Sequence, residues 1–156
     1  MTVRPFGLDY RGRVTKWAYS QVGRNDPLPY WRSALGPRPG PYPKHWCGAF
    51  ALAALHAAGL ALDVRWIVGS GFLLRTLDQT RDPLPGDIAY FRRLSHHAIV
   101  GDVEVDGALV ELINGNSRPY VDGRSAVQVS RVLTNGPESP SSYFSIERFL
   151  DSARTG

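Results

Sequence analysis

The stretch KHWCGAFALAALHAAG, Lys44 to Gly59, decides the fold of this chain and contains its single cysteine. Positions 47, 50, 51, 54, 55 and 58 are Cys, Phe, Ala, Ala, Leu and Ala, which form an apolar stripe at helical spacing. The opposite side of the same segment is also mostly alanine and leucine. We therefore expect a helix that begins at Cys47, ends at a Gly59 cap and lies in the middle of the molecule.

Length and composition limit the possible classes of protein. The chain has 156 residues, which predicts a single domain over residues 1–156 with one core. No apolar run approaches the roughly 20 residues that a membrane span requires. The net charge of +4 comes from scattered arginines and suits an anionic polymer, but no motif supports a nucleic-acid partner. One cysteine excludes an internal disulfide, no zinc-site spacing is present, and no metal or other cofactor is expected.

The first half of the chain has helical periodicity interrupted by prolines. Arg11–Gly23 places apolar residues at helical spacing and ends on a glycine, which predicts a first helix. Residues 24–45 contain six prolines, so we expect a long ordered loop that leads into Cys47. Ser70–Gln79 is a candidate for a further short helix.

The second half has the alternation of strands. PLPGDIAYF (83–91) predicts a turn and a strand, HHAIVGDVEV (96–105) alternates, and VDGALV (105–110) contains the Asp-Gly of a tight turn before a return strand. Residues 125–132 predict another strand, and SYFSIERFL (142–150) is either a strand or a short helix. The predicted class is α+β, with N-terminal helices and the cysteine helix packed on an antiparallel β-sheet.

Cys47 has two interpretations. A thiol attacks carbonyl groups as the thiolate, and the N-terminus of a helix favours an anion and offers backbone N–H groups to an oxyanion. Alternatively, an unpaired cysteine is among the most buried residue types and fits the apolar stripe. On the helix alone, the buried structural residue is the better interpretation.

A pair of histidines provides a candidate base. In SHHAIV (95–100), period-two alternation puts His96 on the face of Ala98, and His97 on the other face, so only one of them faces Cys47 in a regular strand. The small side chain of Ala98 leaves room for a packed helix. This favours the His96 face as the one that the cysteine helix covers, although a bulge would give the role to His97.

Two asparagines follow on a neighbouring strand. In ELINGNS (111–117), Asn114 and Asn116 are two residues apart and share a face. An amide oxygen in this place accepts a hydrogen bond from an imidazole N–H and fixes the tautomer of the ring, which is the third role in a cysteine–histidine triad.

These segments together resemble a known family. WCGAF at the start of an apolar helix, PLPGDIAYF, a histidine in HHAIV, and INGNS on the next strand are similar, in this order, to the CHAP family of cysteine, histidine-dependent amidohydrolases and peptidases. AYSQVG (18–23) resembles the segment that precedes the cysteine in many members. The family's glycine-histidine-any-small-aliphatic run matches residues 95–99 and assigns the base to His96. Its glutamate position falls on Asn114 and its asparagine on Asn116, which leaves the third role open between them.

The resemblance implies a papain-like fold and a peptidoglycan hydrolase. The bond would be the N-acetylmuramoyl-L-alanine amide or a peptide bond, cleaved through an acyl-enzyme on Cys47 with no metal needed for the chemistry. A thiol deamidase or transglutaminase-like toxin acting on protein would use the same triad. The non-enzymatic alternative is an inactive module that binds the cell wall.

The remaining expectations concern the cleft and the setting. Trp46, His45 and Gln21 are weaker candidates for the substrate cleft. The N-terminal sequence has no classical signal peptide, so we expect synthesis in the cytoplasm and action on the cell wall after phage release or delivery by a secretion system. The residues do not identify a delivery or immunity partner.

Overall fold

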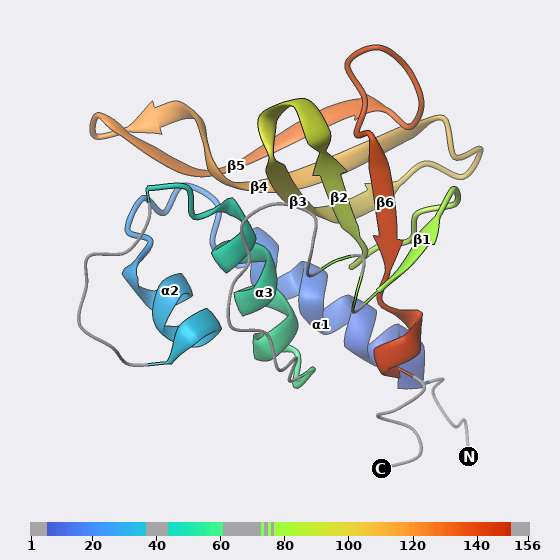
Figure 1. The fold of residues 1–156 in the computed structure, drawn as a ribbon, viewed down its shortest axis with the longest axis horizontal. Helices are drawn as coiled ribbons and strands as arrows, with labels where there is room; N and C mark the ends of the chain where they lie inside the picture. Colours follow the sequence, from blue (N-terminus) through green and yellow to red (C-terminus); the bar gives the residue numbers. More distant parts are fainter. Residues whose placement is uncertain (1–5, 37–43, 61–72, 74, 76, 151–156) are drawn as a thin grey trace.

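The computed structural model describes residues 6–36, 44–60, 73, 75 and 77–150 (Figure 1). In chain order the elements are α1 (Phe6–Ser20), α2 (Leu28–Leu35), α3 (Cys47–Ala57), β1 (Asp78–Thr80), β2 (Ile88–Phe91), the short 3₁₀-helix η1 (Arg92–Leu94), β3 (His96–Val103), β4 (Leu109–Val121), β5 (Arg124–Leu133) and β6 (Ser142–Ser145). Helices precede strands, so the predicted α+β class is confirmed. No described helix has the length and apolar character that crossing a membrane requires.

The strands form one antiparallel sheet in the order β1-β6-β2-β3-β4-β5. Figure 1 shows α1 and α3 against one face of this sheet. Helix α3 contacts β3, β4, α1 and α2, and every residue from Cys47 to Leu55 is buried. The prediction of a central helix that begins at Cys47 is confirmed, as is the left-handed backbone at Gly59, whose φ is 92°.

The two faces of the sheet carry separate apolar clusters. The cluster on the helix side includes Phe50, Ile99 and Ile113, whereas Ala98 and Val100 belong to the cluster on the opposite face. The prediction that the cysteine helix covers the Ala98 face is therefore wrong. The physical reason is that α3 itself supplies the small side chains, so the sheet meets it with isoleucines.

The helix α2 lies inside the segment expected to be a loop. Pro27 is the residue that caps this helix and Pro29 lies in its first turn, where the backbone N–H has no partner within the helix and its loss is harmless. The expectation of irregular structure is therefore wrong for Leu28–Leu35, and 37–43 lie outside the described residues.

Several boundaries also differ from the expected ones. The first helix spans Phe6–Ser20 rather than Arg11–Gly23. Half of the residues of the helix expected at Ser70–Gln79 lie outside the described residues; Leu73 and Arg75 are helical, and Asp78 and Gln79 belong to β1. The segment 142–150 contains both alternatives, since β6 is followed by helical residues at 147–150.

A long hairpin of β4 and β5 extends beyond the return strand that the sequence predicts. Its turn is formed by Asp122 and Gly123, both with positive φ (51° and 75°), as a tight hairpin turn requires. The pairing register shifts between Asn114 and Ser117, and Asn116 has a φ of 59°. This irregularity lies where the candidate asparagines are, and it separates their environments.

Asp87 joins the helices to the sheet. Its carboxylate, 1% exposed, forms an ion pair with Arg11 of α1 at 2.8 Å and accepts hydrogen bonds from the backbone N–H groups of Leu84 and Ile146. Burial raises the pKa of Asp87 although Arg11 acts in the opposite direction. We infer that Asp87 is a structural residue of the turn before β2.

Candidate active site

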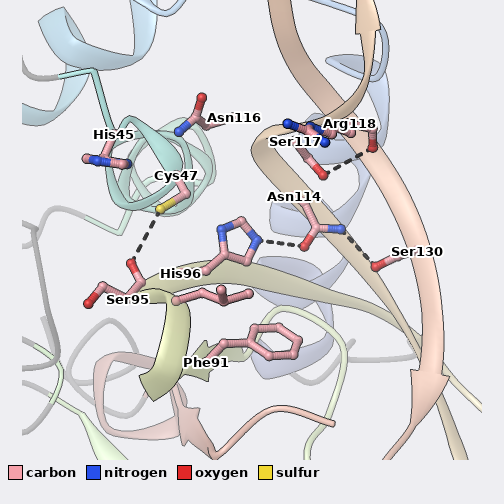
Figure 2. Close-up of a pocket in the computed structure, with 11 residues that line it drawn as sticks. His45, Cys47, Phe91, Ser95, His96, Asn114, Asn116, Ser117, Arg118 and Ser130 are labelled. Atoms are coloured by element: carbon pink, nitrogen blue, oxygen red, sulfur yellow. Dashed lines mark hydrogen bonds between the residues drawn. The ribbon is translucent and has the colours of Figure 1, made fainter. Parts of the chain in front are cut away.

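A cavity of about 410 Å³ lies between the N-terminus of α3 and the start of β3. It is lined by Cys47, His96, Asn114 and Asn116, the four residues that the sequence puts forward as catalytic, and by His45. Figure 2 shows the His96 ring between Cys47 and Asn114. The fold therefore brings together residues that are up to 69 positions apart in the chain, from Cys47 to Asn116.

Cys47 is the first residue of α3, and it is only 5% exposed. Its Sγ lies 3.9 Å from the carbonyl oxygen of Ser95 and 3.7 Å from His97 Nδ1. Ser95 adopts a left-handed conformation (φ 47°, ψ 40°) that ends η1 directly before β3. The Ser95 carbonyl oxygen accepts in its contact with the thiol, whereas the donor in the contact with His97 depends on the tautomer of that ring.

Burial sets the protonation state of the sulfur. It raises the pKa of the Cys47 thiol, while hydrogen bonds from the backbone N–H groups of His97, Gly48 and Cys47 act in the opposite direction and are outweighed. The start of the helix therefore does not by itself produce a thiolate. At neutral pH the resting side chain is the thiol, and a nucleophile requires a base nearby.

The His96 ring is held by Asn114. His96 Nε2 lies 2.9 Å from Asn114 Oδ1, and Asn114 Nδ2 donates to Ser130 Oγ at 2.9 Å and to the carbonyl oxygens of Leu112 and Gln128. These acceptors fix the amide nitrogen, so the amide oxygen faces the imidazole. His96 must then carry its proton on Nε2, which leaves the lone pair on Nδ1.

The environment of His96 keeps the ring neutral. Desolvation by burial lowers the pKa of His96, and the hydrogen bond to Asn114 raises it by a smaller amount. A neutral imidazole with its lone pair on Nδ1 accepts a proton, which is what a general base does.

His97 lies against the sulfur from the other side. It is 1% exposed, its ring packs on Tyr90 with centroids 4.9 Å apart, and its Nδ1 contacts Cys47 Sγ. Of the two histidines, His97 is the one in contact with the sulfur, whereas His96 lines the cavity into which Cys47 opens. His97 shares its face of β3 with Ile99, which packs against α3, so this contact agrees with the alternation of the strand.

The two asparagines have different partners. Asn114 contacts His96, whereas Asn116 Oδ1 accepts a hydrogen bond from Ser125 Oγ at 2.5 Å. Both side chains line the cavity. Of the two residues that the sequence leaves open for the third position, the structure places Asn114 on the imidazole.

The three weaker candidates lie in three different places. His45 lines the same cavity as Cys47. Trp46 is buried and stacks on Tyr30 with ring centroids 5.5 Å apart, and it lines a second cavity. Gln21 is buried, accepts a hydrogen bond from Tyr30 at 3.1 Å, and is not among the described residues that line the Cys47 cavity.

Other residues of the site have no clear signal in the sequence. Ser95 contributes a carbonyl oxygen, and Ser130 contributes the hydroxyl that orients Asn114. Ser130 pairs with Leu112 across β4 and β5, so its role depends on a strand register that alternation alone does not fix. Arg118 also lines the cavity, and among the described lining residues none is Asp or Glu.

A second cavity of about 840 Å³ adjoins the first across the segment 44–47. Lys44 and Trp46 line the second cavity, whereas the alternate residues His45 and Cys47 line the first. The hydrogen bond between Asn116 and Ser125 likewise joins a residue of each cavity. The two cavities are therefore neighbours.

Neither cavity contains a metal-binding arrangement, because the described residues include no group of three His, Cys, Asp or Glu side chains placed to hold an ion.

Comparison of this chain with models of known protein families, with curated proteins and with solved structures finds no match. The likeness to the CHAP family therefore depends on this chain's own residues.

Proposed function

We propose that this chain is a cysteine amidohydrolase or peptidase of the CHAP type, with a papain-like arrangement, that cleaves an amide bond of peptidoglycan. The observation that carries the proposal is the cavity that Cys47, His96 and Asn114 share, with Asn114 fixing the tautomer of His96. This is the arrangement that a thiol needs when burial keeps it protonated.

The chemistry follows from the positions of the protons. The Cys47 thiol gives its proton to His96 Nδ1 as the sulfur attacks the carbonyl carbon, and the Asn114 amide oxygen stabilises the imidazolium through Nε2–H. The backbone N–H groups at the start of α3 are donors for the oxyanion. His96 then gives the proton to the leaving amine, and water releases the acyl group from the sulfur.

The surroundings of the site favour an anionic polymer as substrate. The described residues that line the Cys47 cavity include Arg118 and His45 but no carboxylate, and the chain has a net charge of +4. Peptidoglycan peptides carry free carboxylates, which a guanidinium binds well. The adjoining second cavity offers a place for the substrate beyond the bond that is cleaved.

The experiment is digestion of purified peptidoglycan, with new amino groups counted and fragments identified by mass spectrometry. We expect the wild type to release one kind of amino terminus, and Cys47→Ala and His96→Ala to lose release by at least about a hundredfold. His56→Ala is the matched control, because His56 lies on α3 and its Nδ1 faces Ser33 rather than the Cys47 cavity.

The same experiment separates the alternatives. Equal release by the wild type and by Cys47→Ala would contradict the proposal. Ammonia released from a protein substrate with no peptidoglycan product would indicate a deamidase. Binding to peptidoglycan without any product, and unaffected by alkylation of Cys47, would indicate a binding module.

A further inference from the structure

His97 is buried directly beneath the sulfur, and the mechanism above does not use it. We infer that His97 is a positioning residue: its Nδ1–H donates a hydrogen bond to Cys47 Sγ and stabilises the thiolate that forms during attack. This role rests on the proposed function for its purpose, but the contact itself is a property of the fold. In this scheme His97 is the donor in contact with the sulfur, and His96 is the base that shares the cavity with it.

The direction of the hydrogen bond follows from a count of protons. The thiol has one proton, and besides the backbone N–H groups the sulfur contacts the Ser95 carbonyl oxygen at 3.9 Å and His97 Nδ1 at 3.7 Å. We assign the thiol proton to the carbonyl oxygen, which only accepts, and in this assignment Nδ1 presents its N–H to the sulfur lone pair. When the sulfur loses its proton to His96, this donor remains in place.

The surroundings of His97 suit a fixed donor better than a base. Its ring packs on Tyr90, its neighbour in the β2–β3 register, and its side chain is 1% exposed. His97 is not among the described residues that line the cavity, whereas His96 is. A base must exchange protons with the substrate's leaving group, and the position of His96 allows this.

A donor to the sulfur has a definite energetic effect. A hydrogen bond to a charged acceptor is stronger than one to a neutral acceptor, so it favours the thiolate over the thiol. The backbone N–H of His97 acts on the sulfur in the same sense. His97 thereby offsets part of the cost of forming an anion at a buried position.

Other groups that titrate or carry charge surround the sulfur and enter any measurement over pH. They are His96 on β3, His45 before α3, Arg118 on β4, and Tyr90 of β2 through its contact with His97. His96 lines the same cavity as the sulfur, so each variant of His97 is compared in the wild-type and in the His96→Ala background.

The test uses the single cysteine of the chain. The rate of alkylation by iodoacetamide is measured against pH for the full-length protein, and it reports residue 47 alone. Asparagine places its amide nitrogen near the position of Nδ1, and glutamine places it near Nε2. We expect His97→Val and His97→Gln to move the midpoint of alkylation upward by about one pH unit, which is about a tenfold slower rate below the midpoint, and His97→Asn to stay close to the wild type.

Two controls keep the outcome clear. Thermal unfolding tests whether each variant is folded. His56→Asn should leave the alkylation profile unchanged, because His56 lies on α3, the helix of Cys47, but its side chain contacts Ser33. If His97→Val is alkylated with the wild-type profile, or if the asparagine and glutamine variants behave alike, the positioning role is wrong. If His97→Asn loses peptidoglycan hydrolysis while His96→Ala keeps it, His97 is the base and the inference is likewise overturned.

Alkylation requires no substrate, so this result is independent of the hydrolase proposal. A shifted profile in a protein that releases nothing from peptidoglycan would support the contact and contradict the proposed function. Hydrolysis of peptidoglycan together with an unshifted alkylation profile would support the proposed function and contradict the role of His97.

Discussion

Gly115 of β4 lies directly against Phe50 of α3. A Cβ atom at position 115 would come within 2.6 Å of Phe50 Cβ, closer than two carbon atoms approach without a shift of the backbone. Phe50 is three residues after Cys47, and Gly115 stands between the two candidate asparagines. The absence of a side chain at this position therefore sets how closely the sulfur and Asn114 approach.

We expect Gly115→Ala to separate α3 from β4. Overpacking of this kind costs about 1–3 kcal/mol, and it should also reduce peptidoglycan hydrolysis because the cavity widens. Urea unfolding measures the change in free energy. Gly12→Ala on α1 is the control, since nothing lies within 4 Å of its added methyl group and alanine favours a helix. A Gly115→Ala protein as stable and as active as the wild type would show that the close approach is unimportant.

Removing one partner of the buried ion pair between Arg11 and Asp87 should strongly destabilise the fold. Arg11→Met leaves the carboxylate buried without its cation, for which we expect a loss of about 3–5 kcal/mol. Burial already raises the pKa of Asp87, and loss of Arg11 should raise it further. A carboxyl group whose pKa is raised in the folded state lowers the free energy of unfolding as pH rises. The stability lost in Arg11→Met should therefore be smaller in acid, where Asp87 is protonated.

The exposed ion pair between Arg148 and Asp78 is the matched control. Its donor and acceptor are 2.8 Å apart, but both side chains are more than half exposed. Arg148→Met should therefore change the free energy of unfolding by about 1 kcal/mol or less. Equal losses for the two arginine variants would contradict the structural role of Asp87.

The acid limit of activity should depend on Asn114. Because burial lowers the pKa of His96 from its ordinary 6.5, the base stays neutral, and we expect the acid limb of kcat/KM to lie below pH 6.5. Asn114→Asp adds a negative charge beside the ring, which favours the imidazolium and should move this limb to higher pH. A pH–rate profile that is unchanged in the aspartate variant would argue against His96 as the base.

Tyr120 should affect substrate binding rather than chemistry. It is 54% exposed, lines the second cavity and supports the guanidinium of Arg118, which lies 5.2 Å from the centre of its ring. We expect Tyr120→Ala to raise KM for peptidoglycan fragments severalfold with kcat nearly unchanged, because the interaction is the same in ground and transition states. Leu133→Ala, at an exposed position outside both cavities, is the control.

The elements that apolar periodicity defines could be predicted from the sequence. The helix at Cys47, the strand at His96 and the hairpin after it follow from spacings of 3.6 and 2, which depend on neighbouring residues alone. The α+β class follows from their order. The prolines concealed α2. A proline is compatible with a helix in its first turn but not in its interior, and the sequence alone does not tell which of the two positions a proline occupies.

The arrangement of the site could be predicted only in part. Alternation predicts that His96 and His97 lie on opposite faces of the strand, but which face meets the helix depends on the volumes of both partners, and α3 is rich in alanine. The choice between Asn114 and Asn116 depends on a register shift in β4, which a single sequence does not encode locally. The contact between His97 and the sulfur follows from alternation once the Ile99 face of β3 is known to meet α3, because His97 lies on that face.

The pairing of Cys47 with His96 is tested most directly by a double-mutant cycle on peptidoglycan hydrolysis. Residues that act as one catalytic unit are strongly non-additive. We therefore expect Cys47→Ala, His96→Ala and the double variant to be about equally inactive, with all three folded. If His96→Ala keeps wild-type activity, or if its loss multiplies that of Cys47→Ala, the sulfur and this imidazole do not work together.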